Sequence, residues 1–346
     1  MTGGPEVFST EAGPRRRSLA AAVEERFLVP AYSSRWRLAP IAVHRSLALP
    51  LQLAGKVHRW RIDAPGGTVE VVGIGREKLI APICTRLFGA LPPPHREAPR
   101  SVLDPGYLAE TDADLVVAEV HPWMAPRFQR AGWLLVPEAV RWQGDLASVP
   151  PAVPSHSLRK DLRKVRNNGF TIEHTTARAD WDEFFTTMVR PQAYARHGES
   201  AWVPSLPLMR RFERSGTLHL VSHHGRRVAG VCSIGHGSVL WLPVSGVRDG
   251  DRLLLKQGAL VAALGLTFEW ARSQGYLHLD LGRTGAFLND GIQNHKRKWG
   301  LLPVPDPLAH VAAVLVRCAS VRKAFSREPV LVQSGAGLRV YAGESA

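Results

Sequence analysis

The stretch TLHLVSHHGRRVAGVCSIGHGSVLWLPVSG, residues 217–246, decides the fold. It holds three short apolar runs, joined by two short connections that contain glycine. Such runs predict neighbouring antiparallel strands, that is, a β-meander. Pro243 interrupts the third run. Because proline cannot donate a hydrogen bond to a sheet, we expect the third strand to bulge or to lose its pairing there.

A helix and a further strand follow the meander. Residues 251–275 carry apolar side chains on one helical face, and YLHLDLG at 276–282 alternates as a strand does. A strand–helix–strand connection allows the last strand to lie parallel to the third strand of the meander. If Pro243 breaks the ladder, the two parallel strands separate, and an extended ligand can bind between them. Gly282 is then expected to turn the chain sharply out of the sheet.

A strongly basic helix precedes the meander. In SLRKDLRKVRNNGF, residues 157–170, the apolar positions lie on one face, and five Lys and Arg fill the others. Ser155 or Ser157 can cap its start. The basic residues form either a solvated face or an anion-binding surface. Two further helices are predicted at 180–198, with an interruption at Pro191, and at 204–216.

The first half reads as mixed α/β without a chemical motif. It shows strand candidates at 66–74, 113–121 and 133–142, an exposed Pro-rich loop at 89–100 and a Pro-rich linker at 147–157. The predicted organisation is an N-terminal domain 1–154 with a flexible leader 1–18, a second domain 155–304, and a C-terminal part 305–346 with an apolar helix at 308–318 and a tail.

Composition narrows the class of protein. The chain has 346 residues, 45% of them hydrophobic, which suits two globular domains. Its three cysteines are too scattered for a disulfide framework or a zinc site, so a reducing, cytoplasmic setting is expected, without a metal. No apolar stretch is long enough for a membrane span.

Charge points to an anionic partner. The net charge is +14, and residues 155–304 hold 21 Lys and Arg against 12 Asp and Glu. Phosphates, coenzymes, RNA or acidic lipids would suit this excess, and free use of arginine by the genome is the alternative explanation.

Two candidate sites follow from the predicted elements. Near Gly250, the start of the long helix faces the predicted cleft, where free N–H groups and the flanking Arg248 and Arg252 suit phosphate. Asp280 lies near the end of the last strand, on the same side as His278, and either group can act as a base. The alternative role for Asp280 is structural, either to hold the turn at Gly282 or to pair with Arg283.

The order of elements over 155–304 resembles the GNAT acyltransferase fold. The motifs HSLRKDLRKVRNNGF, YLHLDLGRT and DGIQNHKRKWG look like the FemAB-like (BioF2-like) branch of that superfamily. The resemblance implies tandem GNAT-like domains, the first degenerate, each with a mixed central sheet flanked by helices. It implies transfer of an acyl group from acyl-CoA or acetyl-CoA to an amine or hydroxyl of a small-molecule, sugar or cell-envelope acceptor. Aminoacyl-tRNA as the donor, or a catalytically silent binding protein, are the alternatives.

The resemblance also implies roles for particular residues. Lys296 matches the lysine of a Lys-x-x-Trp/Phe-Gly motif and is implied to contact the donor's phosphate or the developing oxyanion, and Arg283 and Lys298 are further phosphate candidates. Trp299 is expected to be a packing anchor, and Cys232 a core residue. The pyrophosphate loop of GNAT enzymes would fall at 247–252, which reads VRDGDR here and does not match.

Overall fold

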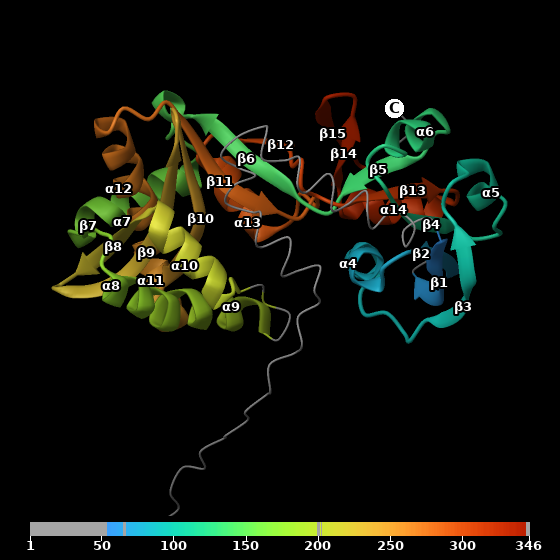
Figure 1. Ribbon diagram of the computed structural model, residues 1–346, viewed down its shortest axis with the longest axis horizontal. Helices are drawn as coiled ribbons and strands as arrows, with labels where there is room; N and C mark the ends of the chain where they lie inside the picture. Colours follow the sequence, from blue (N-terminus) through green and yellow to red (C-terminus); the bar gives the residue numbers. More distant parts are fainter. Residues whose placement is uncertain (1–53, 65–66, 199–200, 202, 344–346) are drawn as a thin grey trace, which may run out of the picture. The chain divides into compact units, whose positions relative to one another are not determined.

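The computed structural model describes residues 54–64, 67–198, 201 and 203–343 (Figure 1). The predicted leader, 1–18, lies outside these residues. The expectation of a mixed α/β fold is confirmed, with two mixed sheets, a separate hairpin and flanking helices.

The first sheet has six strands in the order β3-β1-β2-β4-β13-β5. All neighbours are antiparallel except β2 and β4, which are parallel. Its strands are β1 (Ala54–Ala64), β2 (Gly67–Ile74), β3 (His95–Ser101), β4 (Leu115–Val120), β5 (Leu134–Pro137) and β13 (Val311–Val316).

The second sheet has seven strands in the order β12-β6-β11-β10-β9-β8-β7. Only β10 and β11 are parallel. Its strands are β6 (Val140–Asp145), β7 (Thr171–Thr175), β8 (Thr217–His223), β9 (Arg226–His236), β10 (Val239–Val247), β11 (His278–Thr284) and β12 (Leu302–Pro305). The predicted meander is therefore confirmed as β8-β9-β10.

The remaining elements are mostly helices. The hairpin is β14 (Val330–Ser334) with β15 (Gly337–Tyr341). The helices are α4 (Glu77–Phe88), α5 (Pro105–Ala109), α6 (Ala125–Arg130), α7 (His156–Asn168), α8 (Arg178–Glu183), the π-helix η3 (Phe184–Val189), α9 (Arg190–His197), α10 (Leu206–Ser215), α11 (Arg252–Gln257), α12 (Ala259–Ser273), α13 (Gly291–Lys298) and α14 (Ala319–Arg327), with 3-10 turns η2 (Leu146–Ser148) and η5 (Arg248–Gly250).

Each sheet takes a strand from beyond the predicted boundaries at 154 and 304. The single strand expected over 133–142 is two strands, β5 in the first sheet and β6 in the second. The helix expected at 308–318 is wrong, because this run forms β13, which inserts between β4 and β5. A continuous short apolar run suits a strand buried on both faces as well as it suits a helix. The Pro-rich loop at 89–100 also contains most of β3.

Helices cover both faces of the second sheet. His219 of β8 stacks edge-on against Trp270 of α12. The next residue, Leu220, lies on the same side as Gly230, whose added Cβ would meet Phe184 of η3 at 2.8 Å. Because successive strand residues point to opposite faces, α12 and η3 cover opposite faces of this sheet.

The long helix expected over 251–275 is broken at Gly258, which has φ +98° and separates α11 from α12. Helix α7 supports the break, because Lys164 Nζ donates to the carbonyl of Lys256 at 2.8 Å and Asn168 Nδ2 donates to that of Gln257 at 2.8 Å. The predicted Ser155 cap of α7 is confirmed, since its hydroxyl accepts from Leu158 N at 3.2 Å. Carbonyls at a helix end need such partners.

Candidate functional site

Strands β10 and β11 pair over only three residues, from Val239 with His278 to Trp241 with Asp280. Beyond Trp241 they separate, and the pairing of β10 with β9 also shifts register between Trp241 and Val244. Pro243 lies inside this shift. The predicted separation of the two parallel strands at Pro243 is therefore confirmed.

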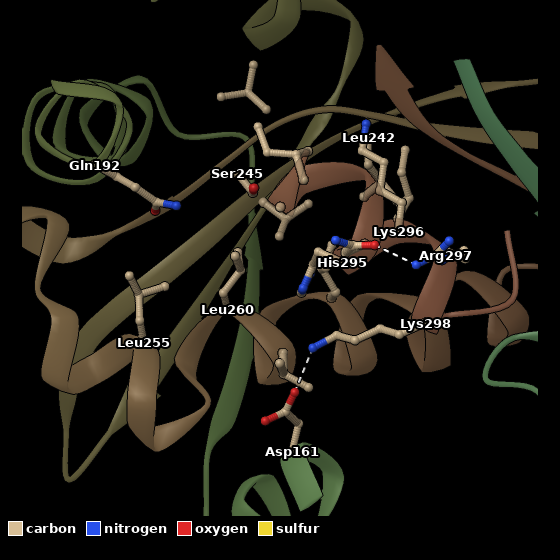
Figure 2. Close-up of a pocket in the computed structure, with 18 of the residues that line it drawn as sticks. Asp161, Gln192, Leu242, Ser245, Leu255, Leu260, His295, Lys296, Arg297 and Lys298 are labelled. Carbon is tan, nitrogen blue, oxygen red and sulfur yellow. Dashed lines mark hydrogen bonds and ion pairs between the residues drawn. The ribbon is translucent and has the colours of Figure 1, made fainter. Parts of the chain in front are cut away.

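A cleft of about 1180 Å³ opens at the separated strands. Its walls come from β10, β11, α7, α9, α11, α12 and α13 (Figure 2). The side chains from α11 and α12 are apolar, including Leu255, Leu260 and Leu264. The charged side chains that line it are Asp161, Arg196, Arg283, Lys296, Arg297 and Lys298, five cations against one acid. This imbalance favours an anionic ligand.

Lys296 is a buried lysine in the wall of this cleft. Its side chain comes from α13 and points towards the separated strands (Figure 2). Its Nζ donates to the carbonyl of Gly282 at 3.1 Å and to that of Arg283 at 3.0 Å. Burial lowers the pKa of Lys296 to about 7, against the opposing effect of Asp280 and Asp290. An ammonium group has three donors, so one remains for a ligand oxygen.

Asp280 is fully buried and does not line the cleft. Its Oδ2 accepts from Arg141 Nη2 and from Gln143 Nε2, the latter at 2.7 Å, and its Oδ1 accepts from Gly282 N at 2.7 Å. Arg141 and Gln143 belong to β6. The carboxylate therefore joins two strands and holds the backbone at Gly282.

Gly282 has φ +72°, yet β11 continues through it to Thr284. The pairing of β11 with β6 shifts register between Asp280 and Arg283. The expected sharp exit from the sheet is thus wrong, and Gly282 forms a β-bulge. The bulge turns the carbonyls of Gly282 and Arg283 towards Lys296, which explains the need for glycine at this position.

His278 lies apart from the cleft. It is the first residue of β11, its side chain is exposed, and it is not among the residues that line the cleft.

The residues predicted to bind phosphate before α11 lie outside the cleft. Arg248 donates to Glu183 and to the carbonyl of Arg227, and Arg252 is exposed. Gly250 is buried against α9, where an added Cβ would meet Ala195 Cβ at 2.8 Å. None of Arg248, Gly250 and Arg252 lines the cleft.

Arg283 and Lys298 do line the cleft, and both are also held by acids. Arg283 Nε lies 2.5 Å from Asp306 Oδ2. Lys298 Nζ donates to Asp161 Oδ2 at 2.6 Å, across the opening between α13 and α7 (Figure 2). Of the predicted set, the structure thus brings Lys296, Arg283 and Lys298 together in the lining of the cleft.

His295 is a cleft residue that the sequence reasoning did not single out. It lies in the view between Leu260 and Lys296 (Figure 2). Burial and then the charges of Lys298 and Arg196 lower its pKa to about 3. The only signal for it in the sequence was its position in the basic run, directly before Lys296.

Two packing predictions hold. Trp299 is fully buried and meets Phe268 edge-on, with ring centroids 5.0 Å apart. Cys232 is fully buried in β9, and burial raises the pKa of its thiol well above the ordinary value.

Among the described residues, no group of three His, Cys, Asp or Glu side chains is arranged to hold a metal. None of the described helices combines the length and apolar character needed to cross a membrane.

Residues 155–297 match the family model of the acetyltransferase (GNAT) domain. No curated protein matches the sequence. Similar solved structures include the C-terminal domain of a putative lysylphosphatidylglycerol synthetase from Agrobacterium fabrum, with 13% identity over 75% of this chain and 80% of that one and a TM-score of 0.38. L-PGS from Bacillus licheniformis shows 12% identity over 76% and 81%, with a TM-score of 0.39. A GCN5-related N-acetyltransferase from Sphaerobacter thermophilus shows 17% identity over 58% of each chain, with a TM-score of 0.34. At these identities and TM-scores, the likenesses bear on neither donor nor acceptor.

Proposed function

We propose that the segment 155–297, which matches the GNAT family model, transfers an acyl group from a coenzyme A thioester to an amine or hydroxyl of a small-molecule, sugar or cell-envelope acceptor. The observation that carries the proposal is the cleft between the separated strands β10 and β11, with its cationic side at α13. The family match supports a transferase, and the choice of donor and acceptor is the proposal.

The cleft suits an extended thioester donor. Past Trp241 the two strands no longer pair with each other, so the edges that face the cleft can offer backbone hydrogen bonds to an extended pantetheine arm. The apolar wall of α11 and α12 can cover that arm, as apolar walls do in most ligand sites.

Lys296 can stabilise charge on the donor. Two of its three donors are bound to the carbonyls of Gly282 and Arg283, which fixes the ammonium in the wall of the cleft. A fixed, buried donor stabilises a developing oxyanion or a phosphate more than a mobile surface lysine does. The chemistry needs no enzyme nucleophile: the acceptor attacks the acyl carbon, the carbon–sulfur bond breaks, and the thiolate leaves.

The donor can be tested by thermal shift with coenzyme A, acetyl-CoA and a long-chain acyl-CoA. A ligand at 100 times its Kd adds about 2.7 kcal/mol of stability, which raises the melting temperature measurably. The variant K296M should lose most of the shift, whereas K256M, which changes an exposed lysine outside the cleft, should keep it. If none of the three compounds moves the melting temperature of the wild type, the thioester proposal is wrong.

Aminoacyl-tRNA is the second candidate donor, and a groove beside the cleft favours it. The groove has a volume of about 700 Å³ and lies between α7 and α12, with apolar residues such as Leu162 and Phe268 in its wall. Its charged residues are Arg159, Lys160, Arg163, Arg166, Glu269 and Arg272, five cations against one acid. A surface of this kind suits the backbone of a nucleic acid.

A filter-binding assay with deacylated tRNA tests this candidate. Each lysine or arginine that contacts a phosphate steepens the fall of affinity with salt, so R163Q should reduce the salt slope by about one. R214Q, on α10 and outside the groove, serves as the control. Binding that is weak in low salt, or unchanged in R163Q, would leave coenzyme A as the proposed donor.

A catalytically silent binding protein is the third reading. It would be supported if a donor binds and no acceptor is modified.

A further inference from the structure

His295 lines the cleft, and one of its ring nitrogens is buried without a hydrogen-bond partner. Its Nε2 is enclosed and makes no hydrogen bond with any described residue. Most buried polar atoms in proteins are hydrogen-bonded, so an orphaned nitrogen in a cleft wall needs an explanation. A ligand that enters the cleft can complete this pairing.

Each of the three neighbouring cations of α13 already makes at least one hydrogen bond. Lys296 donates to two carbonyls, Lys298 donates to Asp161, and Arg297 Nη2 donates to Asn294 Oδ1 at 2.6 Å. These contacts fix the cations around the imidazole. His295 differs from these cations because its Nε2 has no hydrogen-bond partner in the described part of the chain.

The charges around the ring keep it neutral. The groups that act on it are Lys296 and Lys298 from α13, Arg196 from α9 and the opposing Asp161 from α7. With burial, they lower the pKa of His295 to about 3. At neutral pH one ring nitrogen therefore carries the proton and the other a lone pair, and in the tautomer protonated at Nδ1 it is Nε2 that accepts a hydrogen bond from an N–H or O–H group.

The same charges select the acceptor. A cleft lined by five cations and one acid makes it costly to bring in an ammonium group, and it favours the neutral form of an amine. Only the neutral amine can attack an acyl carbon. An acceptor with a second positive charge, such as a diamine or a basic peptide, is repelled by the same field.

We propose that His295 binds the attacking amine or hydroxyl of the acceptor, and that this acceptor carries no second positive charge; the proposal rests on the acyl transfer proposed above. In the step, the acceptor nitrogen or oxygen bonds to the acyl carbon while the carbon–sulfur bond breaks. The thiolate leaves with the electron pair, and the proton of the acceptor passes to the thiolate or to solvent. His295 orients the attacking atom and does not keep the proton.

Three amines of equal length test the selectivity. Hexylamine, 6-aminohexanoate and hexane-1,6-diamine differ only in the group at the far end, which is neutral, negative or positive. With acetyl-CoA as the donor and release of free thiol as the readout, we expect turnover with the first two and at least tenfold less with the diamine. Equal turnover with the diamine would overturn the proposal.

Variants of His295 test its role. H295L keeps the volume but loses the hydrogen bond, and we expect the KM for the acceptor to rise about tenfold while the KM for acetyl-CoA stays unchanged. H295Q places an amide near the position of Nε2 and should restore much of the loss. H236Q changes an exposed histidine outside the cleft and serves as the matched control. If H295L raises both KM values together, or neither, the role is wrong.

A binding measurement decides the proposal even without turnover. The ring ¹⁵N resonances of His295, assigned by comparison with H295Q, should stay those of a neutral ring down to pH 5. At pH 9, hexylamine should shift them and hexane-1,6-diamine should not. A ring that becomes protonated near pH 6.5, or resonances that no amine shifts, would overturn the proposal. If acetyl-CoA does not bind, the proposed function is wrong, but the ring resonances still show whether His295 binds an amine.

Discussion

Arg141 and Asp280 form an ion pair across strands β6 and β11, and its carboxylate is fully buried. Gln143 Nε2 and Gly282 N complete the coordination of that carboxylate. Arg141 precedes the family-matched segment 155–297 in sequence, and Asp280 lies within it. Asp280, which the sequence suggested as a base, is thus held between two strands and does not line the cleft.

The variant D280N should reduce stability rather than chemistry. Removing one partner of a buried ion pair leaves the other charge uncompensated, which costs about 3–5 kcal/mol. Unfolding in urea gives the measurement. D249N, which changes an exposed carboxylate 3.6 Å from Arg226, is the control and should cost less than about 0.5 kcal/mol. Unchanged stability together with lost turnover would instead make Asp280 a catalytic group.

Affinity for an anionic donor should fall as pH rises from 7 to 9. Burial lowers the pKa of Lys296 to about 7, so the free protein loses this positive charge over that range. K296R stays charged and should show a flatter dependence. Isothermal titration of coenzyme A at pH 6, 7, 8 and 9 measures both slopes. Identical slopes for the two proteins would show that Lys296 does not contact the donor.

Lys296 should also make stability depend on pH. Its pKa is about 7 in the folded state and about 10.4 in an unfolded chain, so between these values the unfolded state binds more protons. The free energy of unfolding must therefore rise with pH in this window. We expect the difference between wild type and K296M to shift in favour of the wild type from pH 7 to pH 10. The exposed Lys256 gives the control variant K256M, for which the difference should stay constant.

Trp299 should be a stability residue. It is fully buried and meets Phe268 edge-on, so W299A leaves a large cavity and should cost about 3–5 kcal/mol. W123A removes a tryptophan that is 55% exposed and should cost far less. Urea unfolding of both variants measures the contrast, and equal losses would contradict the packing role.

Two glycines should respond differently to alanine. Both Gly250 and Gly282 have positive φ, which strains any other residue by about 1 kcal/mol or more. At Gly250 the new methyl group would also clash with Ala195 Cβ at 2.8 Å, whereas at Gly282 the nearest atoms are 3.6 Å away. G250A should therefore lower the free energy of unfolding more than G282A does. The reverse order would contradict the close packing against α9.

The sequence predicted the local pattern well and the long-range pairing poorly. The meander, the break at Pro243, the Ser155 cap and the packing of Trp299 follow from spacing and residue chemistry, and all are confirmed. The helix assigned to 308–318 failed because β13 is short and buried between two strands, where periodicity does not separate strand from helix.

The candidate site shows the same contrast between what a local motif predicts and what depends on long-range contacts. Lys296 came from a motif, and the structure places it in the cleft. Arg248 was expected beside the ligand, but one acid distant in sequence holds it: Glu183 pairs with Arg248 and also with Arg227. His295 could not be distinguished from its basic neighbours, since its enclosed nitrogen depends on α7 and α9 as well as on its own helix.

Each sheet takes a strand from across a predicted domain boundary, so truncation at such a boundary removes strand pairing. A fragment that begins at residue 155 would have no β6, the strand that pairs with both β11 and β12. Its sheet would gain a bare edge, and Asp280 would lose Arg141 and Gln143. Exposed edges of this kind recruit other chains. Expression of the family-matched segment alone should therefore yield aggregates, whereas a fragment that starts before Val140 keeps the edge covered.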